Sequence, residues 1–102
     1  MNIWVFSGMY DGELFASSHL TEKGAFLTAI ADIMQFTGHD DDQEDFLERY
    51  GLEAEEAPPS DMGEMRKMPL TEIVAIYRKW DGLSWDNQYG YQTAIIGTRL
   101  GV

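Results

Sequence analysis

Hydrophobic and polar residues alternate with a period of two at the start of the chain. The alternation runs over residues 3–20 and is interrupted by Asp11-Gly12. This pair favours a two-residue type I′ turn, because both central positions of that turn need a positive φ. A turn of that length fixes the pairing, so Gly8 should lie opposite Phe15. We therefore predict a β-hairpin over 3–20.

The alternation sorts the side chains of this hairpin into two faces, and both faces are apolar. One face carries the aliphatic side chains Ile3, Val5, Met9, Leu14, Ala16 and Leu20. The other face carries the aromatic side chains Trp4, Phe6, Tyr10 and Phe15. We expect the aliphatic face to pack on the core. The aromatic face is either covered by later elements, which we favour because monomers seldom leave large apolar patches open, or forms a contact surface.

After the hairpin the hydrophobic period changes to that of a helix. Apolar residues such as Phe26 and Ile30 recur at helical spacing. Thr21 suits an N-cap, and Gly38 supplies a left-handed stop. The pattern predicts a helix over 21–37 that lies across the aliphatic face of the hairpin.

Four further segments follow from periodicity and from turn residues. We expect an acidic helix over 40–51, a linker or lid over 53–68, a helix over 69–80 that stops at Asp81-Gly82, and a C-terminal strand or hairpin over 83–100 that includes Trp85. Met62, Met65 and Met68 of the lid either lie on the core or form a strip for a partner. The order of elements predicts a single α+β domain over 1–102, in which about three helices pack on an antiparallel sheet.

The negative charge is concentrated in the middle of the chain. Eleven of the 18 acidic residues lie between residues 40 and 64, beside the single base Arg49, so this stretch carries 1 − 11 = −10 of the net charge of −11. Such a charge repels nucleic acid and anionic lipid, so we expect a basic protein surface as the partner. The candidate binding residues are Asp41, Asp42, Glu44, Asp45, Glu48, Glu55 and Glu56.

Motifs for catalysis and for cofactors are missing from the sequence. The chain has no cysteine, no phosphate-binding glycine motif and no nucleophile elbow. The acidic run that starts at His39 also departs from a calcium loop. Asp45 stands where the loop needs glycine, and Gly51 stands where it needs glutamate. We predict that the protein is not an enzyme and has neither a cofactor nor a specific metal site.

Two features of the sequence bear on cellular location, namely the start of the chain and its longest apolar runs. The start is strand-like and lacks the features of a signal peptide, and no apolar run approaches the ~20 residues that a membrane span needs. We expect a cytoplasmic protein without a membrane partner, which would be in the host cell if the chain is phage-encoded. A homodimer is compatible with the sequence.

The start of the chain and its composition resemble those of known groups of inhibitor proteins. The start, Ile3-Trp4-Val5-Phe6 followed by Tyr10-Asp11-Gly12-Glu13-Leu14, resembles the opening strand and turn of antirestriction DNA mimics. As a small acidic chain without cysteine, it also resembles anti-CRISPR proteins in composition. The resemblance implies a non-enzymatic inhibitor, from a phage or another mobile element, that binds a basic nucleic-acid-binding surface of a CRISPR-Cas or restriction complex as a DNA mimic.

Two alternatives remain open at this point. The first is an adaptor or regulatory domain that binds a protein partner through the aromatic face of the hairpin. The second is a small protein that binds divalent cations through its clustered carboxylates.

Overall fold

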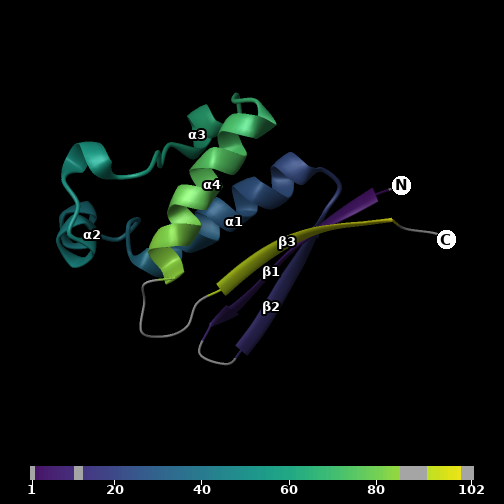
Figure 1. The fold of residues 1–102 in the computed structure, drawn as a ribbon, viewed down its shortest axis with the longest axis horizontal. Helices are drawn as coiled ribbons and strands as arrows, with labels where there is room; N and C mark the ends of the chain where they lie inside the picture. The colour runs from purple at the N-terminus through teal and green to yellow at the C-terminus, as the bar shows by residue number, and fades with distance from the viewer. Residues whose placement is uncertain (1, 11–12, 86–91, 100–102) are drawn as a thin grey trace.

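The protein has an α+β fold, as predicted, with helices on one side of an antiparallel sheet. The structure, a computed structural model, describes residues 2–10, 13–85 and 92–99. The strands are β1 (Asn2–Tyr10), β2 (Glu13–His19) and β3 (Gln92–Arg99), in the order β2-β1-β3. The helices are α1 (Glu22–Thr37), α2 (Gln43–Tyr50), α3 (Met62–Met65) and α4 (Leu70–Trp85), with a 3₁₀ turn η1 (Ala54–Glu56). Figure 1 shows α1 and α4 beside the sheet, and α2 and α3 farther from it.

The register of the hairpin agrees with the prediction. Strands β1 and β2 are antiparallel, and Gly8 lies opposite Phe15. The turn at Asp11-Gly12 lies outside the described residues. Strand β3 pairs with β1 on its other side, so the C-terminal strand joins the sheet of the hairpin. β1 is therefore the central strand.

The helices cover the aromatic face of the hairpin, and the expectation that they cover the aliphatic face is wrong. On the aromatic side, Phe6 is only 2% exposed and Gly8 is buried. On the opposite side, Ala16 and Ser18 of β2 are exposed. Alternation could not decide between two apolar faces, because it shows only which residues share a side. A helix layer buries more area on the side with the larger aromatic rings.

Helix α1 begins and ends at the predicted signals. The hydroxyl of Thr21 accepts a hydrogen bond of 3.0 Å from the backbone N–H of Gly24. Gly38 has a φ of 81°, which is the left-handed conformation that favours glycine. The core between the helices is made of Ile30, Ile33 and Met34 of α1, Phe46 of α2, Met65 of α3, and Ile73, Ile76 and Trp80 of α4.

Helix α4 is longer than the sequence suggested. The predicted stop at Asp81-Gly82 is wrong, because the helix continues to Trp85. The start of the predicted C-terminal strand or hairpin at residue 83 is therefore wrong as well, because Trp85 belongs to α4 and β3 begins at Gln92. Leu83, one turn beyond Trp80, packs on the core, and this burial offsets the cost of about 1 kcal/mol for a glycine inside a helix.

The segment over 53–68 lies on the core as a lid. Met65 is fully buried, and Met62 and Met68 are partly buried against the core, so the proposed methionine contact strip is wrong. Pro58 is buried, and the carbonyl oxygen of Pro59 accepts a hydrogen bond of 2.9 Å from Nε1 of Trp80. The prolines thus fasten the lid to α4.

Candidate functional site: the acidic pole

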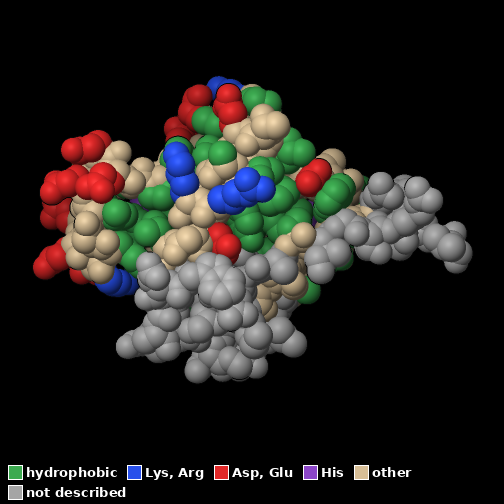
Figure 2. Space-filling view, in the orientation of Figure 1, with side chains coloured by type: hydrophobic (Ala, Val, Ile, Leu, Met, Phe, Trp, Pro, Cys, Tyr) green, Lys and Arg blue, Asp and Glu red, His purple; other side chains and the backbone are tan. Residues whose placement is uncertain are grey.

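Nine exposed carboxylates surround α2 and η1 at one end of the molecule. We call this group the acidic pole. Its members are Asp40, Asp41, Asp42, Glu44, Asp45, Glu48, Glu53, Glu55 and Glu56, and all of them are exposed. Figure 2 shows acidic side chains gathered over α2, with a second group over α3. The acidic stretch over 40–64 is therefore two surfaces, and the larger one carries nine acids and Arg49, a charge of 1 − 9 = −8.

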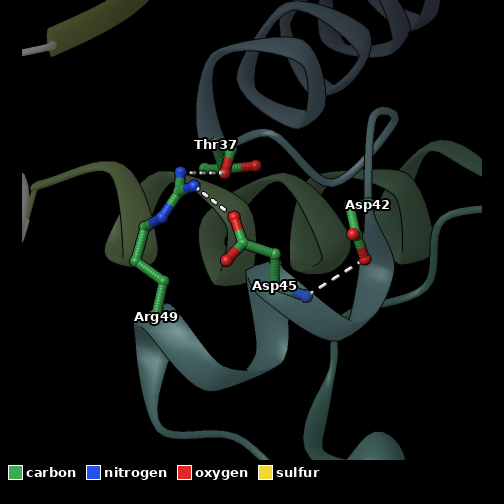
Figure 3. A network of polar contacts seen from close by, with 4 residues as sticks. All are labelled: Thr37, Asp42, Asp45 and Arg49. Atoms are coloured by element: carbon green, nitrogen blue, oxygen red, sulfur yellow. Dashed lines mark hydrogen bonds and ion pairs between the residues drawn. The ribbon is translucent and has the colours of Figure 1, made fainter.

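The helix at the centre of the pole is short but capped at both ends. Oδ1 of Asp42 accepts a hydrogen bond of 3.2 Å from the backbone N–H of Asp45 (Figure 3). Gly51, with a φ of 67°, ends the helix in the left-handed conformation. An isolated helix of eight residues is not stable in water, so caps and packing must hold it.

One aromatic side chain fixes the pole to the body. Phe46 is fully buried, and its ring centroid lies 5.6 Å from that of Trp80 and 5.1 Å from that of Tyr50. Aromatic pairs at such distances contribute roughly 0.5–1.5 kcal/mol beyond their buried area. Phe46 therefore decides which side of α2 faces inward, and the acids take the other side.

Histidine 39 completes this aromatic anchor. The ring of His39 meets Phe46 edge-on at 5.0 Å and Trp80 edge-on at 5.3 Å. Its side chain is only 11% exposed, and neither ring nitrogen has a hydrogen-bond partner among the described residues. The nearest carboxylate oxygen, Oδ1 of Asp40, is 3.7 Å from Nδ1. In the described part of the chain no three His, Asp or Glu residues come together as metal ligands. His39 thus acts as packing between the loop and α4.

Arg49 links the pole to α1. Its Nη2 donates a hydrogen bond of 2.7 Å to Oδ2 of Asp45, and its Nη1 donates one of 3.1 Å to the carbonyl oxygen of Thr37 (Figure 3). The carbonyl is one of the last in α1, where cations are also favoured by the helix dipole. The single base of the pole therefore holds the pole in place from within.

The far end of the pole is fixed by η1 and by the prolines. Oε1 of Glu56 accepts a hydrogen bond of 3.2 Å from the backbone N–H of Glu53, as part of a capping box. Shortly after it, Pro59 accepts the hydrogen bond from Trp80. Both ends of the acidic segment are therefore attached to the body.

The structure divides the seven predicted acids into two groups. Asp42, Asp45 and Glu56 have partners within the chain. Asp41, Glu44, Glu48 and Glu55 are exposed and have no hydrogen-bond or ion-pair partner among the described residues. Glu44 and Glu48 are four residues apart on one side of α2, which separates them by ~6 Å along the axis. These four acids are the ones available to a partner.

The bases outside the pole leave it uncompensated. Lys67 lies 3.7 Å from Glu64 of α3. No other ion pair to Arg66, Lys67, Arg78 or Lys79 occurs within 2–10, 13–85 and 92–99. The negative potential of the pole therefore extends into solvent.

The structure describes the side chains of two of the four predicted aromatic contact residues. Phe6 is buried under the helices and Trp4 is partly buried. The side chains of Tyr10 and Phe15 lie outside those that the structure describes. The helical pattern of the acidic segment already places Phe46 on the inward side, and the anchors that the sequence missed are His39 and Arg49. Arg49 carried a signal, since it is the only base of the acidic stretch and follows Asp45 by four residues.

Comparison with known proteins adds nothing to the definition of this site. No family model, no curated protein and no solved structure matches the chain. None of the described helices has the length and apolar character to cross a membrane. The acidic pole and its anchors are therefore interpreted from their own geometry.

Proposed function

We propose that the protein is a non-enzymatic inhibitor that binds a basic nucleic-acid-binding surface as a DNA mimic. The partner class we infer is a CRISPR-Cas or restriction complex. The observation that supports this proposal is a charge of −8 on a pole whose two ends are both anchored to the body.

The spacing of the available acids suits a channel that is lined with Lys and Arg. Duplex DNA presents one charge per ~1.7 Å of its axis, counted over both strands. The pole repeats carboxylates every ~6 Å along α2 and adds those of the flanking turns. A cationic channel can bind these carboxylates in place of phosphates, and the opposite charges also speed the encounter.

The anchoring favours binding because it reduces the entropy that is lost when the partner docks. A flexible acidic loop would have to be ordered on binding, at about 0.5–1.5 kcal/mol for each immobilised side chain. Here Phe46 and Arg49 already hold α2 against the body. The pole thus differs from a flexible acidic tail, which makes a protein more soluble but has no fixed shape.

The two alternatives have less support. The adaptor alternative needs an accessible aromatic face, and Phe6 of that face is buried. The cation-binding alternative needs converging ligands, and the described residues contain no group of three. We therefore propose the DNA mimic alone.

The test compares two variants of equal net charge. Glu44→Lys/Glu48→Lys reverses two available acids of the pole, and Glu64→Lys/Glu72→Lys reverses two exposed acids elsewhere. Each variant has a net charge of −11 + 4 = −7. The readout is displacement of labelled duplex DNA from a panel of purified CRISPR-Cas and restriction complexes.

We expect the wild-type chain to displace DNA from at least one complex of the panel. The pole variant should then be weaker by about 100-fold, and the control should stay within about threefold of wild type. Equal losses in both variants would show that only net charge matters. A wild-type chain that displaces DNA from no complex would contradict the proposal.

A further inference from the structure

Gly38 lies at the junction between α1 and the acidic pole. It ends α1 in the left-handed conformation, with a φ of 81°, and Gly51 ends α2 in the same way, with a φ of 67°. Asparagine also adopts this conformation at helix ends, so the backbone angle alone does not require glycine at either position. What surrounds each glycine therefore decides whether a side chain fits there.

The surroundings of the two glycines differ on the side where a side chain would begin. A Cβ atom at position 38 would lie 3.3 Å from Nη1 of Arg49 and 3.9 Å from its Cζ and Nη2 atoms. A Cβ atom at position 51 would meet no atom of the described residues within 4 Å. Nonbonded heavy atoms prefer separations of about 3.5–4.0 Å. Of the two positions, a side chain therefore presses on a neighbour only at 38.

The guanidinium of Arg49 cannot yield to such a side chain without straining its own contacts. Its Nη1 donates to the carbonyl oxygen of Thr37 at 3.1 Å, and its Nη2 donates to Oδ2 of Asp45 at 2.7 Å (Figure 3). The group is planar and rigid, so a shift of Nη1 away from position 38 moves Nη2 as well. We propose that Gly38 is a positioning residue of the acidic pole, because its missing side chain leaves the room in which Arg49 holds α2 against the end of α1.

The consequence for binding rests on the proposed function. A side chain at position 38 leaves every carboxylate of the pole in the sequence but weakens the attachment of α2 to α1 through Arg49. Part of the ordering of the pole then has to take place when the partner docks, and that ordering lowers the affinity. Gly38 thus affects recognition by charges that it does not carry.

The first experiment compares Gly38→Asn with Gly51→Asn in thermal unfolding of the full chain. Asparagine keeps access to the left-handed conformation at both positions. Gly38→Asn should lower Tm by about 3 °C or more beyond the shift in Gly51→Asn, because only the first substitution strains the hydrogen bonds of Arg49. Gly38→Ala and Gly51→Ala repeat the comparison without an amide that can itself form hydrogen bonds.

The second experiment repeats the comparison in the Arg49→Met background, which has no guanidinium for the new side chain to press on. The Tm shifts of Gly38→Asn and Gly51→Asn should there agree within about 1 °C. Displacement of labelled duplex DNA, from any complex that the wild-type chain is found to clear, is a further readout. Gly38→Asn should weaken displacement by about threefold or more in the wild-type background and should have no additional effect in Arg49→Met.

Three outcomes would overturn the proposal. They are equal Tm shifts at positions 38 and 51, a difference that persists in Arg49→Met, and displacement that Gly38→Asn leaves unchanged. Circular dichroism checks the fold, and if Gly38→Asn does not fold, Arg49→Met should restore folding; a failure to do so contradicts the role of Gly38. A wild-type chain that displaces DNA from no complex contradicts the proposed function instead, and the thermal comparison then still decides whether Gly38 makes room for Arg49.

Discussion

The two long helices and the acidic pole are attached to the molecule in different ways. Helix α1 buries six of its 16 residues, and the described core of α4 runs from Ile73 to Trp80. Helix α2 fully buries one of its eight residues, Phe46, and is held otherwise by the partly buried Leu47 and Tyr50 and by a few polar contacts. Buried area distributed over many residues resists any single substitution, whereas a few anchors do not.

At Phe46 this difference lets the shape of the pole be changed without changing its charge. The shape depends on Phe46, on Arg49 and on the helix caps, whereas the charge available to a partner lies on other residues, Glu44 and Glu48 among them. Substitutions at the anchors therefore test the rigidity of the pole, and substitutions at the available acids test recognition.

The largest effect is expected from Phe46→Ala. The ring is fully buried beside Trp80, so its loss should lower the free energy of unfolding by about 3 kcal/mol. Denaturant unfolding measures the total loss, and amide hydrogen exchange locates it. Protection should fall most in α2 and least in α1. Leu47→Ala, at a partly buried neighbour, is the control with a smaller loss. Equal loss of protection in α1 and α2 would show that the pole is not a separate unit.

A smaller effect is expected from Arg49→Met. It removes the hydrogen bonds to Asp45 and to the carbonyl of Thr37 but keeps an apolar stem of similar length. The ion pair is exposed to solvent and screened, so we expect a loss of about 1 kcal/mol, most of it from the carbonyl contact. Thermal unfolding measures the loss. Asp45→Asn, which removes the ion pair alone, should destabilise less than Arg49→Met, and the reverse order would contradict this account of Arg49.

A pair of variants at Asp42, of which the milder has the smallest expected effect, separates the helix cap from the charge. Asp42→Ala removes the acceptor for the N–H of Asp45 and should cost about 1 kcal/mol. Asp42→Asn keeps a good N-cap and removes the charge, so its stability should match wild type within a few tenths of a kcal/mol. Helix content by circular dichroism and unfolding by urea measure both. If the two variants are equally destabilised, the cap is not what Asp42 contributes.

Local signals in the sequence were enough for the parts of the fold that depend on neighbours in the chain. The pair Asp11-Gly12 predicted the register that β1 and β2 adopt, and Thr21 and Gly38 mark the ends of α1. Each of these signals acts through the backbone within a few residues. Gly51 ended α2 for the same reason.

The parts that depend on distant packing were not predictable in this way. Both faces of the hairpin are apolar, so the sequence did not show which face the helices would cover. In the structure they cover the face that carries Phe6. Gly82 did not end α4, because the burial of Leu83 against the core offsets the low helix propensity of glycine. The acids were found from the sequence, but their division into capping, paired and available residues needed the positions of Arg49 and of the backbone N–H groups.

The most direct test of the central claim is the salt dependence of binding to any complex from which the protein is found to displace DNA. The claim is that the pole, and not the net charge, replaces nucleic acid. The slope of the logarithm of the binding constant against the logarithm of salt concentration should be steep for the wild-type chain and for Glu64→Lys/Glu72→Lys. It should become clearly shallower for Glu44→Lys/Glu48→Lys, although both variants carry −7 (−11 + 4). The same slope in both variants would contradict the claim.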